Sequence, residues 1–126
     1  MSVLIDTSVW VEHFRNRNDI LIELIEMDLA LVHQMVLVEL ACGTPPAPRS
    51  KTLNDIALLQ STNQAGLDEV IDFIEREKLY GLGCGLVDMA LLASTLITSG
   101  ARLWTLDKCL ITLAERFDVA YRQSVH

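Results

Sequence analysis

Residues 3–10 read Val-Leu-Ile-Asp-Thr-Ser-Val-Trp, and the apolar pattern changes within them. The three consecutive apolar residues from Val3 to Ile5 predict a short buried strand, and the apolar residues that follow recur at helical spacing. Asp6 and Ser8 both have side chains that suit the first position of a helix. We therefore expect a strand that ends at Asp6 and leads into a helix that Ser8 can cap.

Strand and helix signals alternate along the rest of the chain. Such alternation predicts an α/β fold, a three-layer sandwich in which helices flank a central, mainly parallel sheet. The expected strands are 3–5, 29–32, 102–105 and 119–121, with a further short strand within 61–66. The expected helices are 9–14, 19–27, 35–42, 50–60, 67–79, 87–99 and 108–117.

Length and composition fit a single domain that spans residues 1–126. A chain of 126 residues with a hydrophobic fraction of 51% can bury one core, and division would leave two marginal pieces. No segment holds the roughly 20 apolar residues of a membrane helix. The beginning of the sequence lacks the basic and long apolar regions of a signal peptide. We expect a cytoplasmic protein without membrane association.

The cysteines Cys42, Cys84 and Cys109 are odd in number, and neither a Cys-x-x-Cys pair nor a His at ligand spacing accompanies them. This pattern favours neither a zinc site nor a disulfide framework. Free cysteines most often behave as small buried apolar residues. We expect three buried thiols.

Four acidic residues border or interrupt apolar runs: Asp6 after 3–5, Glu39 within 35–41, Asp88 before 89–92 and Asp107 after 103–106. Burying a carboxylate is costly unless it is paired or binds a metal, and no Arg or Lys has an equally buried context. The four acids therefore predict a site for a hard divalent cation such as Mg²⁺ or Mn²⁺. Their mutual repulsion should raise the pKa of at least one carboxyl group.

Topology places the four acids at one edge of the expected sheet. Ligands gather at the carboxyl ends of parallel strands, where Asp6 and Asp107 follow their strands, while Glu39 and Asp88 lie on helices that can lean over this edge. Asp6, Asp88 and Asp107 also have a structural interpretation, because each stands at the start of a helix. Glu39 does not, because it falls in the middle of a helix with no cation nearby.

The net charge of −7 argues against strong electrostatic attraction to a polyanion. If the four acids bind cations, 13 acids remain against 10 bases, a balance of −3. We therefore expect weak, salt-sensitive binding of nucleic acid in the absence of metal. Basic residues occur in three pairs: Arg15 and Arg17 at the end of the first helix, Arg49 and Lys51 beside the proline-rich loop 44–48, and Arg102 and Lys108 on either side of the strand end at Asp107.

Four motifs in order along the chain resemble those of PIN-domain ribonucleases: the stretch at 3–10, Val-Glu-Leu-Ala-Cys-Gly at 38–43, Gly-x-x-Asp at 85–88 and Leu-Trp-Thr-Leu-Asp-Lys at 103–108. More closely, essentially the whole chain resembles the toxins of VapBC-type toxin–antitoxin modules. The resemblance implies a PIN-like sandwich and a Mg²⁺- or Mn²⁺-dependent endoribonuclease. It also implies hydrolysis of structured RNA, tRNA prominent among the substrates, by water that the metal activates.

The resemblance further implies roles for individual residues. It makes Asp6, Glu39, Asp88 and Asp107 the acidic quartet of the site. Ser8 and Thr105 match hydroxyl positions that steady these acids. We expect direct metal contact from Asp6 and Asp107, direct or water-mediated contact from Asp88, and orientation or deprotonation of the water by Glu39. Many members carry a further acid shortly after the position of Asp107, where this chain has Cys109 and Leu110.

Two kinds of protein partner follow from the resemblance. One is a small VapB-like antitoxin that covers apolar surface and brings a basic side chain toward the quartet. The other is a second copy of the chain, because the helices 19–27 and 87–99 carry more apolar positions than one face of a small sheet covers. We expect a homodimer.

Other classes of protein fit the sequence less well. Receiver-like signalling domains and haloacid-type phosphatases need a second acid after the first strand, and Asp6-Thr7-Ser8 supplies one acid. The glycines of Gly81 to Gly85 do not follow a strand, so we expect a tight turn into the Asp88 helix and no dinucleotide site. The remaining alternative is a catalytically inactive PIN-fold binding module.

Overall fold

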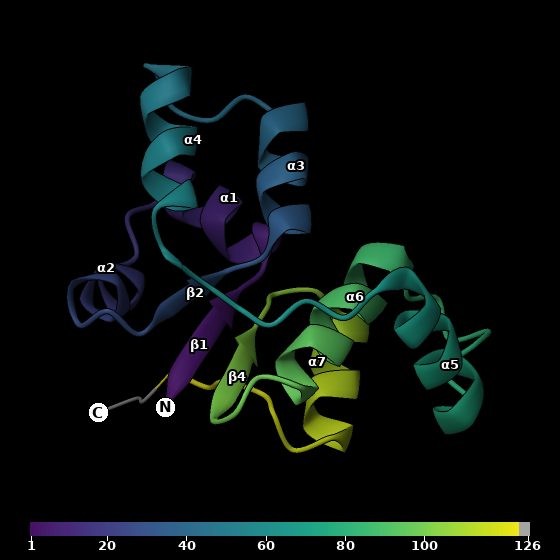
Figure 1. The fold of residues 1–126 in the computed structure, drawn as a ribbon. Helices are drawn as coiled ribbons and strands as arrows, with labels where there is room; N and C mark the ends of the chain where they lie inside the picture. The colour runs from purple at the N-terminus through teal and green to yellow at the C-terminus, as the bar shows by residue number, and fades with distance from the viewer. Residues whose placement is uncertain (124–126) are drawn as a thin grey trace.

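The computed structural model describes residues 1–123, which form a four-stranded parallel sheet flanked by helices (Figure 1). The expected α/β sandwich is confirmed. The strand order β3-β2-β1-β4 places the first strand in the interior of the sheet. The strands are β1 (Ser2–Ile5), β2 (Ala30–Val32), β3 (Gln60–Ser61) and β4 (Ala101–Trp104).

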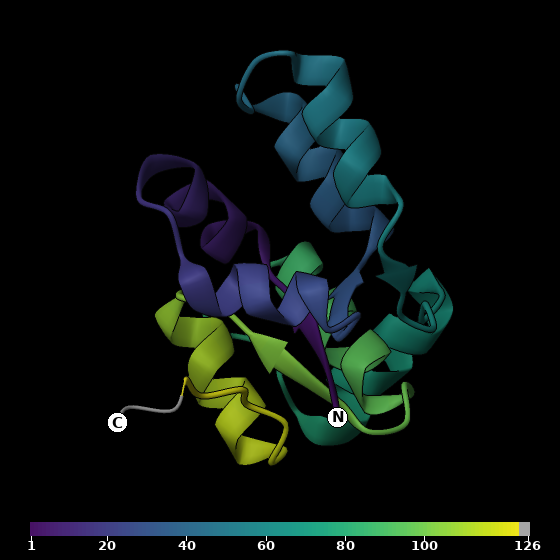
Figure 2. The same ribbon diagram turned by 90° about the vertical axis from the view of Figure 1, so that its left-hand side faces the viewer.

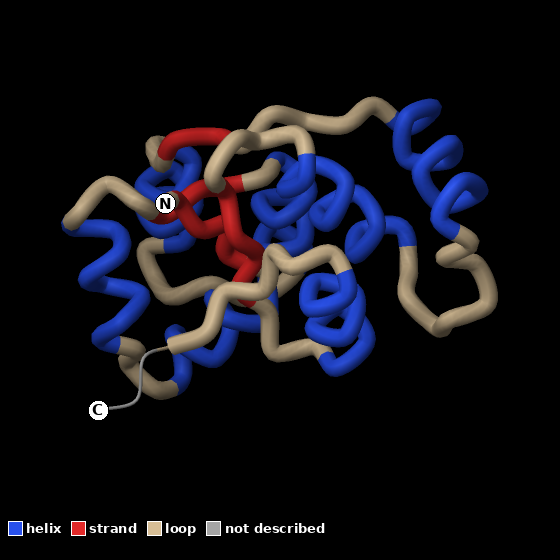
Figure 3. The backbone as a smooth tube through the Cα atoms, turned by 90° about the horizontal axis from the view of Figure 1, so that it is seen from below, coloured by secondary structure: helices blue, strands red, loops and turns tan. Residues whose placement is uncertain are grey.

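Seven helices surround the sheet in this part of the chain: α1 (Thr7–Arg15), α2 (Asp19–Glu26), α3 (Gln34–Cys42), α4 (Arg49–Ala57), α5 (Leu67–Glu77), α6 (Leu86–Leu96) and α7 (Lys108–Arg116). The strands lie between α2 on one side and the helices α6 and α7 on the other (Figures 1 and 3). Beyond the arrowhead of β1 lie α1, α3 and α4 (Figure 1). The α3–α4 pair stands out from the rest of the molecule as a helical hairpin (Figure 2).

The register of the sheet brings the ends of β1 and β4 together. The two strands pair residue by residue from Ser2 with Ala101 to Ile5 with Trp104. The ladder continues one step further, because the amide of Asp6 donates to the Trp104 carbonyl at 2.9 Å. The residues that follow the two strands are therefore neighbours at the carboxyl edge of the sheet.

Several element boundaries differ from those expected. Asp6, not Ser8, caps α1, because its side chain accepts the amide of Ser8. Helix α4 spans Arg49–Ala57 with Pro48 as its N-cap, so it begins one residue earlier and ends three residues earlier than the expected helix 50–60. The strand expected at 119–121 is a single bridge to β4 at Ala120, and β3 overlaps the expected range 61–66 only at Ser61.

Tertiary packing covers the apolar helices more completely than the sequence indicated. Every residue from Met89 to Thr95 in α6 is buried, because α6 packs against α5, α7 and β4. The middle of this helix is therefore covered, but apolar surface remains at its C-terminal end, where Leu96 and Ile97 are 38% and 46% exposed. On α5 the inward face includes Phe73, which is 5% exposed, whereas Ile71 of the same helix is 58% exposed.

None of the helices within residues 1–123 is both long enough and apolar enough to cross a membrane.

Candidate active site

Asp6 is buried at the point where β1 ends, and neighbouring hydroxyl groups fix its carboxylate. Its Oδ2 accepts hydrogen bonds from Ser8 Oγ at 2.6 Å, from Thr105 Oγ1 at 2.8 Å and from the Ser8 amide at 3.3 Å. Thr105 lies 99 residues away in sequence and reaches Asp6 because β4 pairs with β1. Among the described residues, no hydrogen bond uses Oδ1 of Asp6, so this oxygen is available to a ligand.

The same hydroxyl groups connect Asp6 to the segment that carries Asp107. Ser8 Oγ accepts the amide of Leu106 at 3.0 Å, and Thr105 Oγ1 accepts the amide of Asp107 at 3.0 Å. The two hydroxyl oxygens lie 3.4 Å apart. Ser8 and Thr105 therefore occupy the space between two candidate acids and set their relative position through the backbone.

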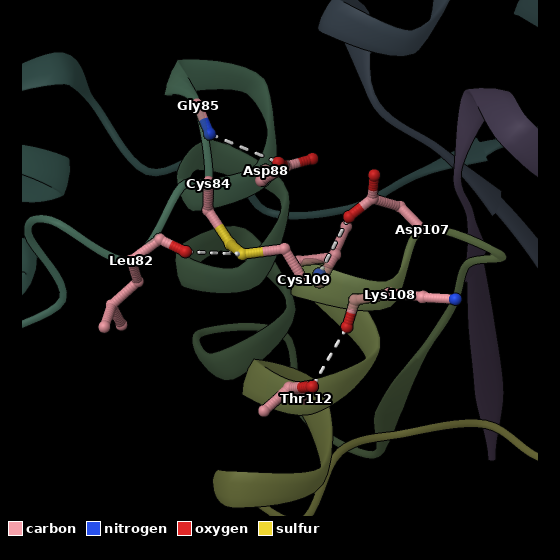
Figure 4. The surroundings of a disulfide bond; sticks show 9 residues. Leu82, Cys84, Gly85, Asp88, Asp107, Lys108, Cys109 and Thr112 are labelled. Atoms are coloured by element: carbon pink, nitrogen blue, oxygen red, sulfur yellow. Dashed lines mark hydrogen bonds between the residues drawn. A yellow bond between two sulfur atoms is a disulfide. The ribbon is translucent and has the colours of Figure 1, made fainter.

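Asp88 and Asp107 are both held at the starts of helices. Asp107 caps α7, where its Oδ1 accepts the amide of Leu110 at 3.0 Å. Asp88 lies in the first turn of α6, where its Oδ2 accepts the amide of Gly85 at 3.2 Å. In each case one oxygen is used by the cap, and the carboxylates point into a common space (Figure 4).

Glu39 projects from the middle of α3 toward the start of α1. Its Oε1 accepts a hydrogen bond from Thr7 Oγ1 at 2.5 Å, and Thr7 directly follows Asp6 in the chain. The side chain is exposed, because α3 buries Val36 and Leu40 on its other face. No local pattern around Thr7 indicates this contact, since Glu39 lies 32 residues away in sequence.

The expectation that all four acids are buried is therefore wrong for two of them. Asp6 is only 6% exposed and Asp88 is partly buried, whereas Glu39 and Asp107 are exposed. An acidic residue beside an apolar run can face solvent when the sheet edge or helix face that bears it is not covered. Asp6 is the one carboxylate of the four that is almost completely removed from water, so the cost of desolvation applies fully to Asp6 alone.

Electrostatic coupling nevertheless connects the four carboxylates. Burial is the main cause that raises the pKa of Asp88 above its ordinary value, and the hydrogen bond from the Gly85 amide opposes it. The negative charges of Asp107, Asp6 and Glu39 raise it further. The expected raised carboxyl pKa is confirmed at Asp88, although burial contributes more than repulsion.

The quartet has no counter-ion among the residues that the structure describes. No salt bridge there involves any of the four acids. Within residues 1–123, no three Asp, Glu, His or Cys side chains converge closely enough to enclose a metal ion. Like charges keep apart when no cation screens them, and each of these carboxylates is held by its own hydrogen bonds.

Two basic residues near the acids have side chains that form no ion pair or hydrogen bond in the described part of the chain, namely Arg15 at the end of α1 and Lys108 at the start of α7. Figure 4 shows Lys108 beside Asp107. The other four bases near the acids or the proline-rich loop are engaged elsewhere: Arg17 with Asp19, Lys51 with Asp55, Arg102 with Asp118, and Arg49 with the carbonyl groups of Ala41 and Gly43.

A groove of about 570 Å³ adjoins Glu39 between α1 and the α3–α4 hairpin. Its walls are mainly apolar, and Arg15 and Glu39 are the charged residues that line it. The groove therefore offers a mostly apolar surface with one charge of each sign. The lining residues are Val11, Phe14, Arg15, Glu39, Leu40, Gly43, Thr44, Pro45 and Pro46.

The expected set of three buried thiols is wrong. Cys84 and Cys109 form a disulfide bond with their Cα atoms 5.9 Å apart, and Cys42 is a free, exposed cysteine. Cys84 precedes the cap of α6 and Cys109 lies in the first turn of α7. The bond joins residues 25 positions apart, and its pairing depends on how these two helices pack, which spacing alone does not show.

Comparison with known proteins reveals close relatives, although no protein-family model matches the chain. Over 123 residues the chain is 40% identical to Ribonuclease VapC32 of Mycobacterium tuberculosis, in strain CDC 1551 / Oshkosh and in strain ATCC 25618 / H37Rv. Each match covers 98% of this chain and 98% of the relative. More than half of the aligned positions differ, so the roles of single residues have to be argued from geometry.

Proposed function

Because the chain belongs to the VapC family of ribonucleases, we propose that it is a divalent-metal-dependent endoribonuclease and the toxin of a toxin–antitoxin module. The proposal is carried by one observation. At the meeting of β1 and β4, the Asp6 carboxylate is fixed by two hydroxyl groups and a backbone amide. Three further acids couple to the same site, and within residues 1–123 no salt bridge neutralises any of them.

The chemistry of the donor set fits a hard divalent cation. Each acid keeps one oxygen that no hydrogen bond of residues 1–123 uses: Asp6 Oδ1, Glu39 Oε2, Asp88 Oδ1 and Asp107 Oδ2. Carboxylate oxygens are preferred ligands of Mg²⁺ and Mn²⁺. We assign direct contact to Asp6 and Asp107, and direct or water-mediated contact to Asp88. When bound, the cation supplies positive charge to the phosphate group under attack.

The residues of the chain divide the remaining work. Ser8 and Thr105 hold Asp6 in one orientation, so this carboxylate needs little rearrangement when it binds. Thr7 holds Oε1 of Glu39, which leaves Oε2 to orient the attacking water and to accept its proton. Glu39 is suited to this role because it is exposed and adjoins the groove.

We propose that the substrate is a structured RNA, with tRNA the first candidate. Arg15 and Lys108 flank the acids without partners of their own in residues 1–123, so both are available to contact phosphate groups. Their contacts would be sensitive to salt, because binding them to RNA releases counter-ions. We therefore propose that the protein acts in the cytoplasm, where tRNA is found.

The test is cleavage of purified tRNA and of other structured RNA by the purified chain in Mn²⁺ and in EDTA. We expect cleavage in Mn²⁺, loss of cleavage in EDTA, and loss in Asp6→Asn. The matched control is Asp68→Asn, since Asp68 also lies in the first turn of a helix but is exposed and outside the site. A folded, soluble chain that cleaves no RNA in Mn²⁺ would instead be an inactive binding module.

We further propose that a small VapB-like antitoxin occupies the groove beside Glu39. The apolar walls suit an apolar segment, and the uncompensated charge of the quartet suits an Arg, whose guanidinium group matches carboxylates. Expression of the chain alone should stop growth, and co-expression of the adjacent small reading frame should restore it. Removing the metal should increase the affinity of the antitoxin for the chain. Equal affinity with and without metal would place the antitoxin away from the quartet.

A homodimer remains our proposal for the assembly of the chain. Apolar side chains of two helices support it: Leu86 and Leu96 of α6 are 58% and 38% exposed, and Leu67 and Ile71 of α5 are 60% and 58% exposed. Light scattering should give about twice the chain mass of 14.1 kDa. A monomer that stays active at high concentration would contradict the proposal.

A further inference from the structure

The disulfide bond joins the two helix starts that carry Asp88 and Asp107. Cys84 lies immediately before Gly85, the N-cap residue of α6, and Cys109 is the second residue of α7. In Figure 4 the bond lies below both carboxylates and crosses from one helix start to the other. The bond therefore links two helix starts that each carry an acid of the site.

The turn that precedes Asp88 contains two glycines with positive φ angles. Gly81 and Gly83 adopt left-handed backbone conformations with φ of 73° and 87°, and added Cβ atoms at either position would meet nothing within 4 Å. The two glycine positions therefore face open space, whereas Cys84, at the end of the turn, is partly buried against the core. Among the described residues, Cys109 is the only residue of α7 that is bonded to residues 80–84: it forms the disulfide with Cys84 and contacts the carbonyl oxygen of Leu82.

The surroundings of Cys109 suit the reduced state as well as the oxidised one. Its Sγ lies 3.5 Å from the carbonyl oxygen of Leu82. A disulfide sulfur carries no hydrogen, so this contact becomes a hydrogen bond only when the bond is reduced to a thiol. The carbonyl group of Leu82 therefore provides an acceptor for the thiol that reduction would create.

We propose that Cys84 and Cys109 are thiol-responsive positioning residues of the acidic site. The oxidised pair holds the start of α6, and with it Asp88, against the start of α7 and Asp107. Reduction releases the turn and lowers the affinity of the site for a divalent cation. The inference rests on the proposed function, because it assigns regulation to the same metal site. Disulfides that form in a reducing compartment are mostly catalytic or redox-sensing, which suits a cytoplasmic protein.

The chemistry is thiol–disulfide exchange with a cellular thiol or dithiol. A thiolate of the reductant attacks one sulfur, forms a mixed disulfide and displaces the other cysteine as a thiolate. A second thiolate of the reductant then attacks the mixed disulfide and releases the remaining cysteine. Two electrons and two protons pass from the two reductant thiols to the protein, which gains two thiol groups, while the reductant becomes a disulfide.

Titration of Mn²⁺ into oxidised and reduced protein tests the proposal. The protein is reduced with dithiothreitol, which is removed under argon, and thiol counting confirms that two thiols have been gained. We expect the dissociation constant for Mn²⁺ to rise on the order of 10-fold on reduction, the lower end of what loss of an outer-shell partner causes. A merely structural bond would change the thermal midpoint without changing this constant at low temperature.

Variants separate the bond from other effects of reductant. Cys84→Ser with Cys109→Ser should bind Mn²⁺ as the reduced protein does and should not respond to dithiothreitol. Cys42→Ser is the matched control, because Cys42 is free and exposed, and it should respond like the unmodified chain. If the double variant does not fold, the oxidised and reduced forms of the unmodified chain still decide the question.

Three results would overturn the inference. Equal Mn²⁺ affinity in the two redox states would leave the bond a structural cross-link while the proposed function stands. A purified chain whose Cys84 and Cys109 stay free under oxidised glutathione would show that the pair does not switch. If neither redox state binds Mn²⁺, the proposed function fails together with the inference.

Discussion

The two halves of the acidic site are held by different means. Asp6 is buried, and its bonds come from hydroxyl groups that the pairing of β1 with β4 brings together over 99 residues of sequence. Asp88 and Asp107 are more exposed, and each is held by an amide three residues away in its own helix start. The sheet thus fixes the first half of the site, whereas local caps and one covalent bond fix the second half.

The largest effect on stability is expected at Asp6. Asp6→Ala leaves the hydroxyl groups of Ser8 and Thr105 without their acceptor, so we expect the free energy of unfolding to fall by about 4 kcal/mol. Asp107→Ala removes one helix cap and should cost only about 1 kcal/mol. Urea unfolding of both variants measures the difference. Equal losses would contradict the division of the site into two halves.

Loss of the disulfide bond should have the next largest effect. The bond closes a segment between residues 25 positions apart, and its removal should cost about 3 kcal/mol through the entropy of the unfolded chain. Urea unfolding of the oxidised and reduced protein gives this value. Cys42 is free, so the oxidised Cys42→Ser variant should keep the stability of the unmodified chain. A loss of about 3 kcal/mol in that variant would show that the effect does not come from the bond.

Thr105→Val tests the hydroxyl network with a smaller change in shape. The variant removes the donor to Asp6 and the acceptor for the Asp107 amide, so we expect a loss of about 2 kcal/mol in stability. RNA cleavage should slow by about 10- to 100-fold, as for other groups that orient a metal ligand. A normal single-turnover rate with the same stability loss would limit Thr105 to a structural role.

The smallest expected effect concerns His33, which caps the helix that carries Glu39. Its Nδ1 accepts the Met35 amide at 3.0 Å, so Nε2 carries the proton and donates to Ser94 Oγ, also at 3.0 Å. Burial lowers the pKa of His33 below its ordinary value of 6.5. The neutral ring is therefore favoured in the folded state, and its contribution is fully present above pH 6.5.

As pH falls below 6.5 toward the lowered pKa, the unfolded chain takes up a proton first and this part of the stability is lost. His33→Asn keeps an acceptor for the Met35 amide but does not titrate. As pH falls, the free energy of unfolding of the unmodified chain should therefore decrease relative to that of the variant. Urea unfolding of both proteins above and below pH 6.5 measures this change. A stability difference that does not change with pH would contradict a neutral, buried His33.

The sequence predicted those parts of the molecule that depend on local pattern. The apolar run at 3–5 and the apolar spacing at 35–42 correspond to β1 and α3. Asp6 and Asp107 were placed correctly at the carboxyl edge of the sheet, because a parallel sheet brings the ends of its strands together. The parts that were wrong depend on contacts between distant segments.

Glu39 and Cys109 illustrate this limit. Glu39 was expected inside because apolar residues surround it in sequence, but α3 covers only one of its faces. The partner of Cys109 depends on how α6 and α7 pack, and the spacing of three cysteines does not determine a pairing. Pattern predicts which face of an element is apolar, whereas burial and pairing depend on what packs against that face.

Whether the four carboxylates act as one cation site is tested most directly by thermal unfolding of the purified chain in EDTA and in millimolar Mn²⁺. Binding to the folded state alone raises the midpoint with the Mn²⁺ concentration. We predict a higher midpoint in Mn²⁺ for the unmodified chain, a much smaller rise for Asp6→Asn, and an unchanged rise for Asp68→Asn. An identical midpoint in EDTA and in Mn²⁺ for the unmodified chain would contradict the metal site.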